Sequence, residues 1–245
     1  MENIGIISLY GLIFGMIGTT LGGFLGAFIN VNSKKILSFI LEFAAGLMTA
    51  IICFDLIPEA LNIINISYCI IGILIGIFSM ILCDNFVNKL CNNHKSLQGN
   101  NLLKTGLIIA IGLAIHNFPE GLAIGAGFES SSTLGLKLAI AIALHDVPEG
   151  ISISLPLKFS GSSKLKAIFI ATISGLTTGI GAFFGAIIGN ISQTLIGISL
   201  AFAAGAMLYI VSCELIPESK RMYTGRFASL GNILGLIIGI LSKSI

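Results

Sequence analysis

Long apolar stretches, separated by short polar connections, run through the whole chain. A helix that crosses the hydrocarbon core of a bilayer needs about 20 mostly apolar residues. Eight stretches of this kind occur, with approximate bounds 5–28, 36–58, 66–87, 104–127, 134–156, 165–189, 193–217 and 226–243. The pattern predicts an all-α membrane protein with eight transmembrane helices, which together form one transmembrane domain over residues 1–245.

Composition agrees with a lipid environment. The mean hydropathy is +1.02, and only 10% of the residues are charged, whereas soluble domains carry about 25%. The net charge of +2 is small and forms no basic stripe, so we expect no nucleic-acid partner.

The apolar N-terminus lacks a preceding positive region and is expected to remain as a spanning helix rather than to be cleaved as a signal peptide. The five cysteines form no CxxC pair and are interpreted as small buried apolar residues.

The distribution of positive charge predicts the orientation. Eleven Lys and Arg residues lie in the connections after the first, third, fifth and seventh spans, and two lie on the opposite side. Positive connections stay in the cytoplasm, so both termini should face outside a cell (inner) membrane. The longest connection, 88–103, would then be a cytoplasmic loop. It contains His94, for which a metal-tethering role and simple solvation both stay open.

Two pairs of segments repeat within the chain. FAAGLMTAIICFDLIPEA starts at Phe43 and FAAGAMLYIVSCELIPES at Phe202, while HNFPEG starts at His116 and HDVPEG at His145. The members of each pair are separated by an odd number of spans, so they run in opposite directions through the membrane. This is the signature of inverted repeats, which are common in transporters. We predict a 3+2+3 arrangement with the fourth and fifth helices at the centre.

The fourth and fifth spans carry polar residues that apolar packing does not need. Each ionisable group at the centre of a spanning helix costs about 2.5–3.5 kcal/mol on insertion scales. Residues at i, i+3 and i+4 share one helix face, so each span presents one polar face. The six residues are His116, Asn117 and Glu120 on the fourth span, and His145, Asp146 and Glu149 on the fifth.

Imidazole and carboxylate groups together suit Zn²⁺ and neighbouring divalent metals. If the two polar faces meet, Glu120 and Glu149 are the expected bridging ligands. Pro119 and Pro148 should kink the helices and release carbonyls one turn earlier, and Gly121 and Gly150 should allow close neighbours. The alternative is a kinked, hydrogen-bonded polar core without metal.

Acidic residues near the ends of the second and seventh spans extend this hypothesis. Carboxylates at the mouths of a pathway attract cations. Such a role is proposed for Asp55 and Glu214, and stays open against simple interfacial placement for Glu59 and Glu218. Met48 and Met207 are related by the repeat, and either line the path or fill the core.

These motifs resemble the ZIP (Zrt/Irt-like) family of metal transporters, especially its compact bacterial members. The resemblance covers essentially the whole chain and includes HNFPEG on the fourth span and HDVPEG on the fifth. It implies import of Zn²⁺, with Fe²⁺, Mn²⁺, Co²⁺ or Cd²⁺ tolerated, through a two-metal site on spans four and five. It also implies a homodimer and an elevator-like motion of the central bundle. The metal is then a transported substrate, and no cofactor is expected.

One departure from the family pattern lies on the sixth span. Many members carry a Glu there within a stretch like SGLxEPxGA, whereas this chain reads SGLTTGIGA from Ser174, with Thr178 at the Glu position. The second metal position therefore loses a carboxylate. We expect it to bind metal more weakly, or the site to hold one ion at a time.

Other functions were weighed against transport. An intramembrane metalloprotease would often contain HExxH, which this sequence lacks, so we do not expect an enzyme. A divalent cation channel or a proton-coupled exchanger shares every feature described above. Saturation of the flux would distinguish a carrier from a channel.

Overall fold

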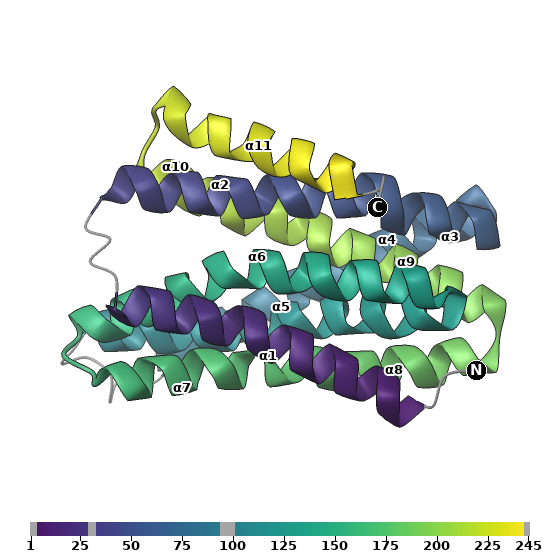
Figure 1. The fold of residues 1–245 in the computed structure, drawn as a ribbon, viewed down its shortest axis with the longest axis horizontal. Helices are drawn as coiled ribbons and strands as arrows, with labels where there is room; N and C mark the ends of the chain where they lie inside the picture. Colours follow the sequence, from purple (N-terminus) through teal and green to yellow (C-terminus); the bar gives the residue numbers. More distant parts are fainter. Residues whose placement is uncertain (1–3, 29–32, 94–100, 243–245) are drawn as a thin grey trace.

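The computed structural model describes residues 4–28, 33–93 and 101–242, with side chains described outside 87–109, and these ranges are helical without strands (Figure 1). The predicted all-α class is confirmed. The helical elements are α1 (Ile4–Phe28), α2 (Lys34–Ile51), η1 (Ile52–Leu56), α3 (Ile57–Ile63), α4 (Ile66–Asn93), α5 (Asn101–Ser130), α6 (Ser132–Phe159), α7 (Lys164–Ser174), α8 (Leu176–Ile191), α9 (Gln193–Ile210), η3 (Val211–Leu215), α10 (Ile216–Met222) and α11 (Arg226–Ser242).

These elements correspond to the predicted spans, with differences at their ends. Within the described residues, six helical segments are long and apolar enough to cross a membrane, and α11 is a shorter apolar helix. The second and seventh spans continue to Ile63 and Met222, beyond the predicted ends at 58 and 217, because Pro58 and Pro217 do not terminate them. The connection between the third and fourth spans is shorter than the predicted 88–103, because α4 extends to Asn93 and α5 begins at Asn101. His94 lies outside the described residues.

The two repeat-related segments share a deviation from α-helical geometry. η1 and η3 are π-helical turns, in which Ile57 N–H reaches Ile52 O and Ile216 N–H reaches Val211 O. A proline, Pro58 or Pro217, follows each turn and cannot donate the next helical hydrogen bond. Such turns occur often at functional sites, and here they carry Asp55 and Glu214.

The helices pack as two bundles. The largest contacts join α1 with α6, α5 with α8 and α5 with α6 on one side, and α2 with α11 and α4 with α9 on the other. We call these the α5/α6 bundle (α1, α5, α6, α7, α8) and the α2/α9 bundle (α2, η1, α3, α4, α9, η3, α10, α11). In Figure 1 the α5/α6 bundle occupies the lower half and the α2/α9 bundle the upper half.

Glycines let the helices of the α5/α6 bundle touch backbone to backbone. A Cβ at Gly121 would collide with the carbonyl oxygen of Thr178 on α8, and a Cβ at Gly150 would collide with that of Thr19 on α1. The close approach that the sequence predicted at these two glycines is confirmed. Both contacts lie one residue beyond a glutamate of the motifs, so they fix the depth at which those glutamates sit.

The cysteine interpretation was only partly correct. Cys69 is buried, but Cys53 and Cys213 are exposed on the chain. Both exposed residues lie in the π-helical turns η1 and η3.

Candidate metal-binding site

Glu120, His145 and Glu149 converge between α5 and α6. One ligand atom from each of the three lies within 4.8 Å of the other two. His145 and Glu149 are four residues apart on α6, so they share one helix face, and α5 presents Glu120 to that face. All three are buried, at 0%, 0% and 1% exposure respectively.

The distances in this group suit a small cation. His145 Nε2 lies 3.0 Å from Glu120 Oε1 and 3.4 Å from Asp146 Oδ1. Ligands at about 2.0–2.2 Å from Zn²⁺ in tetrahedral geometry are separated by roughly 3.4 Å. The distances from His145 Nε2 to Glu120 and Asp146 are close to this spacing, and Glu149 offers an oxygen within 4.8 Å of the ligand atoms of Glu120 and His145.

The carboxylates of the group have few hydrogen-bond donors. Among the described residues, no donor reaches either oxygen of Glu149, and none reaches Oε2 of Glu120. Buried carboxylates are normally paired, hydrogen-bonded or bound to metal, because desolvation of the charge is expensive. Three acidic side chains around a single imidazole therefore fit a divalent cation better than a self-contained polar core. Pro119 and Pro148 lie inside continuous helices beside this group.

His116 points to a different partner. Its Nε2 lies 2.8 Å from Oε1 of Glu214, which belongs to η3 in the other bundle. The His116 side chain is 3% exposed and the Glu214 side chain 32%. We call this pair, His116 and Glu214, the polar step, because it connects a partly accessible carboxylate with the buried group around Glu120.

Asn117 and Thr178 lie on the α8 side of the site. The Asn117 amide donates a 3.0 Å hydrogen bond to the carbonyl oxygen of Ser174, where α7 ends and α8 begins after Gly175. The side-chain oxygens of Asn117 and Thr178 are buried and have no hydrogen-bond partner within the described parts of the chain. Asp146 is also fully buried, and its Cβ lies against Gly18 of α1.

The other predicted pathway residues are not members of the convergent group. Glu59 accepts a hydrogen bond from Ser130 at the end of α5, while Glu218 pairs with exposed Arg221 on its own helix. Asp55 lies in η1 and is half-buried. Met48 and Met207 are fully buried in the apolar core, which favours packing over the pathway role.

Two polar pairs involve acidic residues to which the sequence pattern assigned no role in the site. Tyr209 OH donates to Oδ2 of Asp84 at 2.7 Å, and the charge of Asp84 is near enough to act on Glu214. The sequence could have indicated this pair, because Asp84 is an acidic residue within an apolar stretch that is predicted to span the membrane. Buried Glu42 pairs with Lys220 at 2.8 Å and accepts a bond from Ser219 at 3.3 Å.

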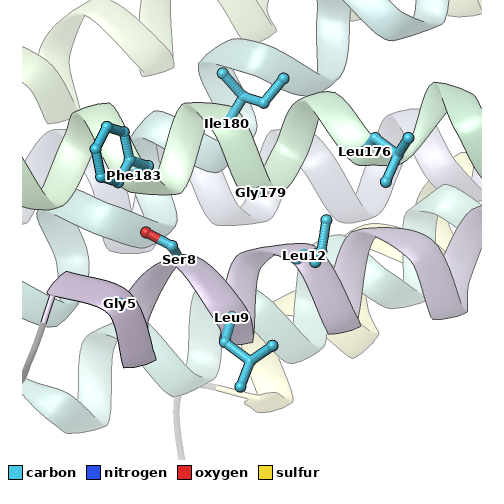
Figure 2. A pocket seen from close by; sticks show the side chains of 8 residues that line it. All are labelled: Gly5, Ser8, Leu9, Leu12, Leu176, Gly179, Ile180 and Phe183. Atoms are coloured by element: carbon cyan, nitrogen blue, oxygen red, sulfur yellow. The ribbon is translucent and has the colours of Figure 1, made fainter.

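An open cavity of about 530 Å³ lies between α1 and α8, away from this chemistry (Figure 2). Its lining is apolar except for Ser8, whose hydroxyl donates to the carbonyl oxygen of Ile4. None of the acidic residues, histidines or amides described above lines it. This lining offers a cation no carboxylate or imidazole ligand.

The chain is similar to known metal transporters. The family model described as ZIP Zinc transporter matches residues 92–245. Zinc transporter ZupT of Chlorobium chlorochromatii is 30% identical over 251 residues, covering 94% of each chain. Zinc transporter ZupT of Salmonella newport is 32% identical, covering 90% of this chain and 89% of its own. Zinc transporter GufA of Myxococcus xanthus is 38% identical over 144 residues, covering 58% of this chain and 57% of its own.

Proposed function

Because the chain belongs to the ZIP family of metal transporters, we propose that it carries Zn²⁺ across the cell membrane into the cytoplasm through the buried group Glu120, His145 and Glu149. The observation that carries this proposal is the convergence of three ligand atoms within 4.8 Å. Nitrogen and oxygen ligands in this mixture accept Zn²⁺, and also Fe²⁺, Mn²⁺, Co²⁺ and Cd²⁺. His116, Asn117 and Asp146 complete the polar surroundings through which the ion passes.

Glu214 and His116 form the step between this group and one face of the membrane. Glu214 is the more exposed of the two, and Asp84 adds a second negative charge beside it. Carboxylates at a mouth lower the energy of a departing or arriving cation. The distribution of Lys and Arg assigns this end to the cytoplasm, so we assign the step to release of the ion.

The pattern of helix contacts supports an inverted repeat. If the first three spans correspond to the last three, and the fourth to the fifth, the contact of α1 with α6 corresponds to that of α8 with α5. The contact of α2 with α11 then corresponds to that of α9 with α4. Both pairs of contacts are extensive, and both repeat segments contain a π-helical turn. An α5/α6 bundle that moves against the α2/α9 bundle would expose the site to each side in turn.

Thr178 favours one ion at a time. Its hydroxyl is buried without a hydrogen-bond partner within the described residues and packs against Gly15 of α1, and a hydroxyl is a weaker ligand for a divalent cation than a carboxylate is. Titration of purified protein with Zn²⁺ should show one tight central ion, and Thr178→Glu should create a second. Two equally tight ions in the unchanged protein would refute this proposal.

Uptake into liposomes tests the function directly. Purified protein should accumulate Zn²⁺ at a rate that saturates with concentration, and Fe²⁺, Mn²⁺ and Cd²⁺ should compete with it. A rate that rises without saturation would favour a channel instead. The homodimer implied by the family resemblance stays a prediction, which the mass of the detergent-solubilised protein would test.

A further inference from the structure

A hydrogen bond joins the two bundles at the end of the molecule opposite the Glu214 mouth. Ser130 Oγ donates to Glu59 Oε1. Ser130 is the last residue of α5, whereas Glu59 lies in α3 of the α2/α9 bundle. The bond therefore crosses the boundary along which the bundles would slide.

Ser130 is rigidly attached to the helices that carry the metal ligands. It is followed by Ser131, which caps the first turn of α6 by accepting a 3.1 Å hydrogen bond from Leu134 N. Phe128 stacks on Tyr10 of α1 with ring centroids 5.4 Å apart. The turn between α5 and α6 thus belongs to the α5/α6 bundle, and any motion of that bundle displaces Ser130 from Glu59.

At the other end of the molecule, the bond that joins the bundles is the one between His116 and Glu214. The repeat counterpart of Glu59 is Glu218, which pairs with Arg221 of its own helix, and these side chains are 49% and 81% exposed. Close to it, Glu214 is 32% exposed and contacts His116 of the buried site. A polar bond therefore crosses the boundary at each end, but the one at the Glu214 end involves a partly exposed carboxylate and reaches His116 beside the ligands.

We propose that the bond between Glu59 and Ser130 is a latch that closes the site toward the side of the α5–α6 turn and must open in every transport cycle. This inference rests on the proposed transport function. With the latch formed, the metal ligands communicate with the side of Glu214. When the latch opens and His116 separates from Glu214, the α5/α6 bundle can move and present the same ligands to the side of Glu59.

Reversible cross-linking tests the latch. In full-length protein whose five native cysteines are replaced by serine, Glu59→Cys and Ser130→Cys are introduced together. A short bifunctional methanethiosulfonate then joins the two thiols, and a reductant releases them. Zn²⁺ uptake into liposomes should fall to the level of protein-free liposomes after cross-linking and recover after reduction.

A matched pair within one bundle is the control. Thr20 on α1 and Thr172 on α7 lie 2.8 Å apart, oxygen to oxygen, and both belong to the α5/α6 bundle. Cross-linking Thr20→Cys to Thr172→Cys should leave uptake unchanged, because these helices move together.

The outcomes separate the latch from the transport function. Failure of the Glu59→Cys and Ser130→Cys thiols to cross-link, or equal uptake before and after cross-linking, overturns the latch. If the parent protein shows no Zn²⁺ uptake, the transport proposal itself fails.

If the double cysteine variant does not insert into the membrane, the single variant Ser130→Ala provides a second test of the latch. It removes the donor with little change in shape. Loss of one hydrogen bond should change the external Zn²⁺ concentration for half-maximal uptake by about two- to tenfold, toward lower values, because more molecules open to the outside. An unchanged value overturns the latch.

Discussion

His116 Nε2 and Glu214 Oε1 lie 2.8 Å apart and belong to different bundles. If this contact hands the ion from the buried group to the mouth, removing the charge of Glu214 should slow transport without emptying the central site. We predict that Glu214→Gln lowers the maximal rate of Zn²⁺ uptake about tenfold, a loss in the range seen when outer partners of metal ligands are replaced. Binding of Zn²⁺ by the detergent-solubilised variant should stay close to that of the parent. An undiminished rate would remove Glu214 from the path.

The central carboxylates should be indispensable. Glu120→Ala and Glu149→Ala each remove one of three converging ligands, so both variants should lose measurable Zn²⁺ binding and uptake while still inserting into the membrane. Isothermal titration and liposome uptake measure the two losses separately. Glu42→Gln is the matched control, since Glu42 is also a buried glutamate but pairs with Lys220 outside the site. Equal losses in all three variants would indicate a general folding defect.

Uptake should decrease as the pH falls from about 7.5 to about 5.5, the range in which histidines commonly gain a proton. A protonated imidazole cannot bind a metal ion, and His145 lies at the centre of the group. The sign is therefore more transport at higher pH. The measurement needs the same pH on both sides of the liposome and a buffered concentration of free Zn²⁺. A flat profile would argue against imidazole ligands.

The spans and the ligand faces were predictable because both depend on local spacing. Apolar length defines a spanning helix, and the i, i+4 relation of His145 and Glu149 needs no knowledge of the fold. Glu214 was predicted from the sequence to lie on the path, and that role stays a prediction, but its contact with His116 joins residues 98 positions apart. Such a pairing depends on how η3 packs against α5, which the spacing within either helix does not specify.

The backbone deviations were harder to foresee than the motifs. Pro58 and Pro217 were visible in the sequence, yet their consequence is a π-helical turn within a continuing helix rather than an end to it. Hydrogen bonding to a carbonyl five residues back keeps most of the backbone paired, which matters in a bilayer where water is absent. For this reason the second and seventh spans run further than the apolar pattern indicated.

Gly121 offers a test of the close packing behind the site. A Cβ there collides with the carbonyl oxygen of Thr178, so Gly121→Ala should push α8 away from α5, lower the melting temperature and reduce Zn²⁺ binding. Gly112 lies on the same helix, and a Cβ there meets nothing within 4 Å. Gly112→Ala should therefore leave both properties nearly unchanged. Similar melting temperatures for the two variants would show that α8 can move away from α5 without a loss of stability.

Lys220 should contribute more to stability than its neighbour Arg221. Its Nζ lies 2.8 Å from Oε1 of Glu42, whose side chain is only 3% exposed, whereas the Lys220 side chain is 40% exposed. Lys220→Ala strands a buried carboxylate and should destabilise the fold by about 1–3 kcal/mol, less than for a fully buried pair because water reaches the lysine. Arg221 pairs with Glu218 on the surface, and Arg221→Ala should change stability by about 0.5 kcal/mol or less. Melting temperatures in detergent would rank the two variants, and an equal decrease in both would show that Glu42 finds another partner when the lysine is removed.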